Sequence, residues 1–190
     1  MSNPKSLQAI ISETTALGFG MASDQQTGEL LRALATSKPQ GRLLELGTGT
    51  GIATAWLLDG MDPASTLVSV DNNAEYAGVA QRHLGHDPRV SFRVEDGSVF
   101  LRSAAGSTFD LIFADTWPGK YHDLDLALDL LALGGLYIVD DLLPQPNWPE
   151  DHAPKVPLFI NAIEQHRDLS IVKLDWSTGL LIAAKRWDDC

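Results

Sequence analysis

The chain has 190 residues, of which 44% are hydrophobic and 21% are charged, and its formal net charge at pH 7 is −11. This length suits one domain with a substantial buried core, and the composition excludes wholesale disorder. The acidic balance argues against a nucleic-acid partner, because affinity for phosphate backbones depends on clustered Lys and Arg side chains. A small-molecule substrate is the better expectation.

Targeting signals are not evident. No apolar run approaches the roughly 20 residues that span a bilayer, and the first residues lack the basic and apolar regions of a secretory signal. The single cysteine, Cys190, cannot form an intrachain disulfide, so an oxidising compartment is not required. We therefore expect a cytoplasmic protein with no membrane association.

Residues 1–38 predict a helical lead-in. Ser23 to Gln26 has the pattern of a capping box, in which Ser23 caps the helix and Gln26 reaches back to it. The helix is expected to stop at residues 37–39, because the proline there cannot continue it.

Beyond residue 38, short apolar strands alternate with helical stretches, a pattern typical of right-handed βαβ units and a parallel sheet. The expected strands are 43–46, 67–70, 90–94, 111–114 and 136–139, and the expected helices are 53–58, 74–84, 99–104 and 124–131.

Two further strands, 169–174 and 180–184, close the chain. The five residues between them, 175–179, are too few for a crossover helix and require an antiparallel hairpin. We predict a single domain, 1–190, with a Rossmann-like doubly wound α/β sheet of seven strands, mostly parallel with an antiparallel C-terminal hairpin.

A glycine-rich loop, Glu45 to Gly51, follows the first strand and opens a helix. Glycines let the backbone approach a ligand closely, and the amides at the helix start face an anion. Asp71 ends the second strand, where a carboxylate can accept hydrogen bonds from both hydroxyls of a ribose. A turn without a ligand, with Asp71 as a helix cap, is the alternative. Ile52 replaces the third glycine of the dinucleotide spacing, which disfavours a nicotinamide-dependent oxidoreductase.

With these motifs the chain resembles the class I S-adenosylmethionine-dependent methyltransferases. The resemblance covers nearly the whole chain, including segments 95–97, 109–115 and 133–136 and the final hairpin. It implies S-adenosylmethionine (SAM) as cofactor, with Asp71 at the ribose and Asp96 and Gly97 beside the adenine. Trp117 either stacks on the adenine or packs under its loop. The cofactor-binding residues implied are Glu45, Gly47, Thr48, Gly49, Gly51, Asp71, Asn72, Asp96, Gly97, Asp115 and Trp117.

Within that class the chain is most similar to the catechol and caffeoyl-coenzyme A O-methyltransferases. This implies Mg²⁺ or another divalent cation held by Asp115, Asp140 and Asp141. Adjacent strand residues point to opposite faces, so Asp140 and Asp141 can share an ion only where the strand has ended. The alternative is that these acids merely line the mouth of the cofactor cleft.

The general base is left open. The resemblance places a lysine three residues after Asp115, where this chain has Pro118, which has no proton to exchange. Asp115 and Asp141 are the catalytic candidates, joined by His122, whose ordinary pKa suits proton transfer near pH 7. Lys120 is a further candidate, although Lys120 and His122 can equally be solvated residues at a helix start.

Residues 143–154 are rich in proline and are not expected to form a helix. They leave the carboxyl end of the sheet, where ligands bind in open α/β folds. We expect this segment to cover the acceptor, with Trp148 and His152 as contacts; a plain surface connection is the alternative.

The sequence thus predicts a SAM-dependent O-methyltransferase of a small-molecule acceptor. A cofactor-binding module without catalysis is the second interpretation. Compared with the resembling enzymes the N-terminal region looks short, which leaves the pocket open or lets a second subunit of a homodimer close it.

Overall fold

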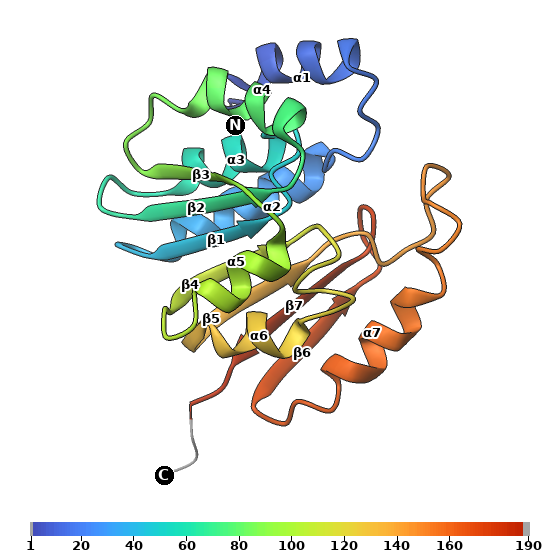
Figure 1. The fold of residues 1–190 in the computed structure, drawn as a ribbon. Coiled ribbons are helices and arrows are strands. Elements are labelled where there is room, and N and C mark those ends of the chain that lie inside the picture. The colour runs from blue at the N-terminus through green and yellow to red at the C-terminus, as the bar shows by residue number, and fades with distance from the viewer. Residues whose placement is uncertain (1, 188–190) are drawn as a thin grey trace.

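The computed structural model describes residues 2–187, and its seven strands form one sheet in the order β3-β2-β1-β4-β5-β7-β6 (Figure 1). The first five strands run parallel, and β7 pairs antiparallel with both β5 and β6. The strands are β1 (Arg42–Leu46), β2 (Thr66–Asp71), β3 (Val90–Val94), β4 (Phe109–Ala114), β5 (Leu131–Val139), β6 (Leu169–Leu174) and β7 (Leu180–Lys185). The predicted α/β fold with its antiparallel C-terminal hairpin is confirmed.

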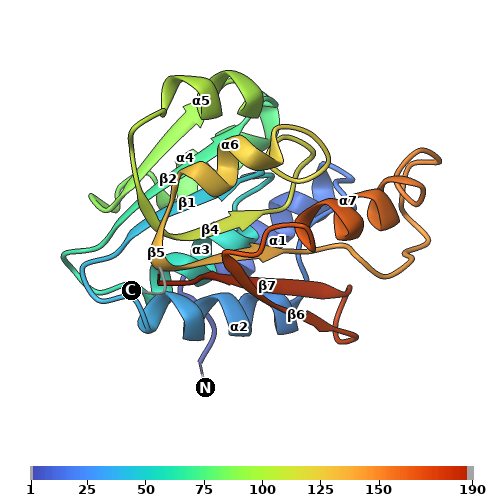
Figure 2. The ribbon, with the colours of Figure 1, turned by 90° about the horizontal axis from the view of Figure 1, so that it is seen from below.

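Helices cover both faces of the sheet. They are α1 (Leu7–Ala16), α2 (Gln25–Thr36), α3 (Ile52–Gly60), α4 (Ala74–Leu84), α5 (Gly97–Ser103), α6 (Leu124–Asp129) and α7 (Lys155–Ile163). One core cluster lies under α5, α6 and α7, and the other lies under α1 to α4. Figure 2 shows α5 and α6 on one side of the sheet and α2 on the other.

The side chains of each strand point alternately to the two faces of the sheet, and this alternation builds the two cores. Leu44 of β1 packs into the cluster under α5, α6 and α7, whereas its neighbour Leu43 packs into the cluster under α1 to α4. Successive strand side chains point to opposite faces, so a strand covered on both sides has to be apolar throughout. Two residues of β1 are not apolar: Arg42 is exposed at its start, and Glu45 is fully buried.

Three expected boundaries are corrected. The cap of α2 is Asp24, whose side chain accepts a hydrogen bond from the Thr27 amide at 2.8 Å, so Ser23 is not the cap. The expected helix 124–131 ends at Asp129, and the expected strand 136–139 begins earlier, because β5 starts at Leu131 and pairs there with β4.

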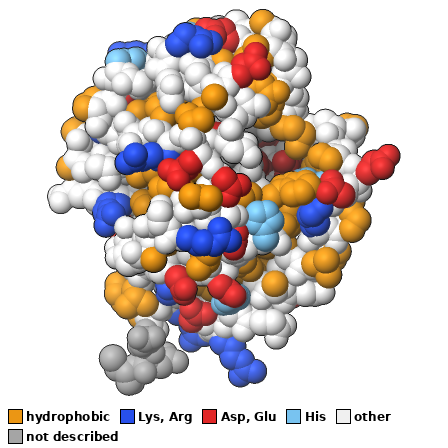
Figure 3. Space-filling view, viewed as in Figure 1, with side chains coloured by type: hydrophobic (Ala, Val, Ile, Leu, Met, Phe, Trp, Pro, Cys, Tyr) orange, Lys and Arg blue, Asp and Glu red, His pale blue; other side chains and the backbone are white. Residues whose placement is uncertain are grey.

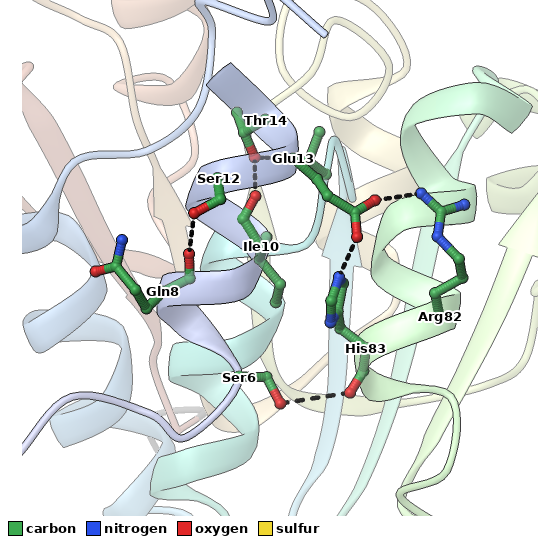
Figure 4. A network of polar contacts seen from close by, with 9 residues as sticks. Ser6, Gln8, Ile10, Ser12, Glu13, Thr14, Arg82 and His83 are labelled. Carbon is green, nitrogen blue, oxygen red and sulfur yellow. Dashed lines mark hydrogen bonds and ion pairs between the residues drawn. The ribbon is translucent and has the colours of Figure 1, made fainter. Parts of the chain in front are cut away.

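Helix α1 was expected only as part of a helical lead-in, and it is held against α4. Glu13 of α1 accepts hydrogen bonds from Arg82 and faces His83 Nε2 at 2.6 Å (Figure 4). Ile10, on the inner side of the helix, is fully buried in the sheet-facing core. This packing fixes where the segment after α1 crosses the edge of the sheet.

Within residues 2–187, no helix is long and apolar enough to cross a membrane. Cys190 lies outside the described residues.

Close packing of α2 on α3 gives a first test. A Cβ added at Gly28 would lie 2.3 Å from the buried Trp56 ring, so Gly28→Ala should lower the free energy of unfolding by about 1–3 kcal/mol through overpacking. At Gly78 of α4 the nearest atom lies 3.6 Å from an added Cβ, and Gly78→Ala should raise stability by roughly 0.5–1 kcal/mol. Urea denaturation of both variants measures this. Shifts of the same sign would contradict the described packing.

Candidate functional site

A cavity of about 370 Å³ opens at the carboxyl ends of β1, β2 and β4. This is where the strand order reverses, between β1 and β4, and where open α/β sheets bind their ligands. Figure 3 shows a hollow in this face of the molecule, with acidic side chains inside it. Among the residues that line the cavity are Phe19, Met21, Ser23, Gly47, Thr48, Gly49, Asp71, Asn72, Tyr76, Asp115, Trp117, Lys120, Asp141 and His152.

The glycine loop forms the wall of the cavity between β1 and α3. Gly47 has φ +104°, and a Cβ there would lie 2.7 Å from the Asp115 carbonyl oxygen. The amides of Gly47 and Thr48 both donate to the Val70 carbonyl, at 2.8 and 3.2 Å. These loop amides are therefore committed to β2, and the amides that can face a ligand are those of the first turn of α3, beginning at Ile52.

Asp71 lies at the end of β2 and lines the cavity. Its Oδ2 accepts from the Gly49 amide at 2.7 Å, and its Oδ1 accepts from the Asn73 amide at 2.8 Å. Asn73, not Asp71, caps α4. Because each carboxylate oxygen has two acceptor positions, both oxygens keep one for a pair of neighbouring hydroxyls.

Glu45 lies behind the loop and not on the cavity surface. Its Oε2 accepts from Thr54 at 2.6 Å and from Ser69 at 2.5 Å, while its Oε1 is buried without a hydrogen-bond partner. Ser69 also bonds Thr48 of the loop at 2.6 Å. Burial raises the pKa of Glu45 to about 8, against the lowering effect of its two hydroxyl donors. The structure therefore gives Glu45 a supporting position beneath the loop.

Acidic side chains and one lysine meet at the other end of the cavity. Asp115 follows β4 and accepts from the Ser23 hydroxyl at 3.1 Å. Lys120 is only 3% exposed, and its Nζ donates to the Asp140 carbonyl oxygen at 2.6 Å. Burial raises the pKa of Asp115 well above its usual range, and the charges of Asp140 and Asp141 act in the same direction. Lys120 is therefore not a solvated residue.

The three acids after β4 and β5 line one small cavity of about 40 Å³ together, but they differ in their contacts. Asp140 is 1% exposed, and its Oδ1 accepts from the Thr178 hydroxyl and from the Asp141 amide. Asp141 has φ +58°, so the backbone turns after β5 and brings Asp141, but not Asp140, to the main cavity. Among residues 2–187, no group of three His, Cys, Asp or Glu side chains is placed to hold a metal ion. In this arrangement Asp115, Asp140 and Asp141 do not converge as the ligand set expected for a divalent cation.

Segment 143–154 is free of helix, as expected, and reaches the cavity through His152. His152 is buried, and its Nε2 lies 2.7 Å from the Tyr121 hydroxyl and 3.3 Å from the Asp141 carbonyl oxygen. Burial lowers the pKa of His152. Trp148 does not line the cavity; its ring stacks on His152 at 4.1 Å. The segment is tied to the chain after α1 by Asn147, whose amide donates to the Gly20 carbonyl.

Several expected site residues lie away from the cavity lining. Asp96 is exposed and caps α5 through the Ser98 and Val99 amides. Gly97 is buried where a Cβ would lie 2.9 Å from Pro118. His122 is exposed and faces Asp123. Gly51 packs on Ala80 of α4. Trp117 does line the cavity, with Lys155 Nζ 4.0 Å from its ring centre.

The aromatic side chains beside Asp71 in the cavity were not predicted from the sequence. Phe19 and Tyr76 line it with ring centroids 4.5 Å apart, and Phe19 approaches Gly49 of the loop. Tyr76 stands in the first turn of α4, a position that the loop-and-strand motif does not include. Phe19 reaches the site only because α1 packs on α4, so no local pattern marks it.

The fold and the cavity define a protein of the methyltransferase class. A family model described as a methyltransferase domain matches residues 44–142, which is more than half of the chain. The chain belongs to this family, and the resemblance seen in the sequence is confirmed.

Particular relatives agree with that assignment. A catechol O-methyltransferase of Mycobacterium tuberculosis is 31% identical over 127 residues, which are 65% of this chain and 58% of that protein. The chain thus spans less than two thirds of the length of these curated relatives. A putative O-methyltransferase of Klebsiella pneumoniae has a TM-score of 0.85 at 25% identity, covering 98% of this chain and 92% of that one. An O-methyltransferase of Bacillus cereus, in complex with SAH, has the same fold with a TM-score of 0.85 at 20% identity, covering 98% and 93%.

The buried Glu45 predicts how stability depends on pH. Its pKa is raised from an ordinary value of 4.5 to about 8 in the folded chain, so between these values the folded state holds a proton that the unfolded state has lost. The free energy of unfolding should therefore fall as pH rises through this window, by at most about 1.4 kcal/mol per pH unit. Glu45→Gln should remove this slope. Urea midpoints from pH 5 to 8 measure it, with the exposed Glu75→Gln as control; equal slopes in all three proteins would refute the assignment.

Proposed function

We propose that this protein transfers the methyl group of SAM to a hydroxyl oxygen of a small-molecule acceptor. The observation that carries the proposal is that one cavity combines two kinds of site. Asp71 and the first turn of α3 form a nucleoside-type site at one end. Asp141, Lys120 and His152, which can exchange or bind protons, lie at the other end. The cavity volume of about 370 Å³ lies within the range of small-molecule sites. The SAH complex of the Bacillus cereus relative and the catechol O-methyltransferase name of the Mycobacterium tuberculosis relative support the same reaction.

At the cofactor end, each group has a distinct part. Asp71 accepts hydrogen bonds from the two ribose hydroxyls with the acceptor positions that the Gly49 and Asn73 amides leave open. The amides that begin α3 face the carboxylate of the methionine part. Trp117, Phe19 and Tyr76 offer flat apolar surfaces for the adenine.

At the acceptor end, the side chain that takes the proton is Asp141. Burial raises the pKa of Asp115 well above its usual range, which favours its protonated form, and Asp140 does not line this cavity. His152 faces Tyr121 through Nε2, and its Nδ1 is buried. Asp141 lines the cavity, so its carboxylate can reach an acceptor hydroxyl there.

The step itself balances without a further reactant. The acceptor oxygen attacks the methyl carbon in line with the carbon–sulfur bond, which breaks with its electron pair going to sulfur. A carbon–oxygen bond forms, the acceptor proton passes to Asp141, and SAH leaves as a neutral thioether. The protein holds the two reactants in line and supplies Asp141 to receive the proton.

Cofactor binding tests the first half of this proposal. Isothermal calorimetry should show saturable binding of SAM and SAH, and Asp71→Asn should weaken both by about 10- to 100-fold, because hydrogen bonds to a charged acceptor are lost. Glu75→Gln, an exposed change on α4, should leave both affinities unaltered. Binding of a nicotinamide dinucleotide in place of SAM would refute the assignment.

Turnover tests the second half. With labelled SAM and a panel of catechols, phenols and carboxylates, Asp141→Asn should lower kcat about 100-fold or more, the usual contribution of a positioned base, while the Kd for SAM stays within about threefold. Asp129→Asn, on the exposed end of α6, is the matched control. Wild-type binding of SAM without transfer to any acceptor would favour a binding module, and full activity in Asp141→Asn would exclude Asp141 as the base.

A further inference from the structure

Among residues 2–187, Lys120 is the one Lys or Arg whose side chain lines the cavity. It is 3% exposed, and its Nζ lies 4.8 Å from the centre of the Tyr121 ring. An ammonium is rarely buried without compensation, because removing it from water is expensive unless opposite charges and acceptors surround it. The groups around Lys120 supply that compensation.

Burial lowers the pKa of Lys120, and the charges of three carboxylates, Asp115, Asp141 and Asp140, act in the opposite direction from beyond direct ion-pair distance. The Asp140 carbonyl oxygen accepts one of the ammonium protons at 2.6 Å. A lysine ammonium has three N–H donors and no acceptor, so two donors remain beyond that bond. Lys120 lines the same cavity as Asp115 and Asp141, which leaves those donors next to the acceptor end.

A divalent cation does not suit the same place. One of its expected ligands, Asp140, has Oδ1 bonded to Thr178 and to the Asp141 amide, which leaves Oδ2 for an ion, and among residues 2–187 no three acids are placed to hold a metal together. An ammonium bonded to the Asp140 carbonyl brings a positive charge to the acid cluster, and that charge would repel a second cation there. The positive charge within this acid cluster is thus supplied by a side chain of the protein, Lys120.

We propose that the Lys120 ammonium takes the place of a divalent metal: it balances the acids after β4 and β5 and donates a hydrogen bond to the acceptor oxygen as that oxygen loses its proton. The proposal rests on the proposed function. It specifies acceptors whose oxygen develops negative charge, such as phenols and catechols, and it predicts transfer without a metal. Lys120 is then a catalytic residue, and Asp140 is a positioning residue that holds it.

The test compares Lys120→Met with Lys38→Met. Lys38 also donates to a backbone carbonyl, that of Gly134 at 2.8 Å, but it does not line the cavity, so Lys38→Met removes the same kind of bond elsewhere. Mn²⁺ binding is followed by the electron paramagnetic resonance of the free ion, SAM affinity by calorimetry, and turnover in the presence of EDTA.

The proposal expects no saturable Mn²⁺ binding at millimolar concentration, and full turnover in EDTA, for both wild type and Lys38→Met. Lys120→Met should lose about 100-fold or more in kcat/KM, as on removal of an oxyanion donor, with the Kd for SAM within about threefold. It should also gain Mn²⁺ binding, because its carboxylates have lost their cation. If Lys120→Met does not fold, Lys120→Gln replaces it, and the wild-type titration stands independently.

Stoichiometric Mn²⁺ binding by wild type together with loss of turnover in EDTA would overturn the proposal. Unchanged turnover and unchanged Mn²⁺ affinity in Lys120→Met would overturn it as well. Failure of the proposed function has a different signature, since wild type would then show no SAM binding, while the Mn²⁺ titrations would still decide whether the lysine takes the place of a metal.

Discussion

The convergence of parallel strand ends is the constraint on which the site depends. β1, β2, β4 and β5 all run in one direction, so the residues that follow them reach the same edge of the sheet. Helices connect the strands on alternate faces, and between β1 and β4 the connections diverge and leave a cavity. Residues far apart in the chain, such as Asp71 and Asp141, face one volume for this reason.

Beneath that cavity, a buried polar layer holds the loop in place. Glu45 bonds Ser69 and Thr54, and Ser69 in turn bonds Thr48. A buried network of this kind fixes geometry at a cost in stability, because a carboxyl out of water has to be neutral or fully bonded. The raised pKa of Glu45 reflects that cost. The loop is thereby shaped before any ligand arrives, which reduces the ordering needed on binding.

At the other end of the cavity, charged side chains form the lining. The charges of three carboxylates act on Lys120 there. The backbone turns after β5, so the Asp141 side chain lines the main cavity while the Asp140 side chain is buried beside Thr178. Residues 143–154 reach this end through Pro149 and His152, and the Trp148 ring stacks on His152.

The sequence by itself determined the sheet, its final hairpin, the glycine loop and the location of Asp71, because alternation, strand length and glycine spacing are local properties of the chain. It also indicated that Asp115, Asp140 and Asp141 gather at one edge. Only the tertiary structure decided which of them faces the cavity, since that depends on the left-handed backbone at Asp141. The burial of Lys120 and the position of Phe19 beside Gly49 also depend on the tertiary structure, because both result from packing between segments that are distant in sequence.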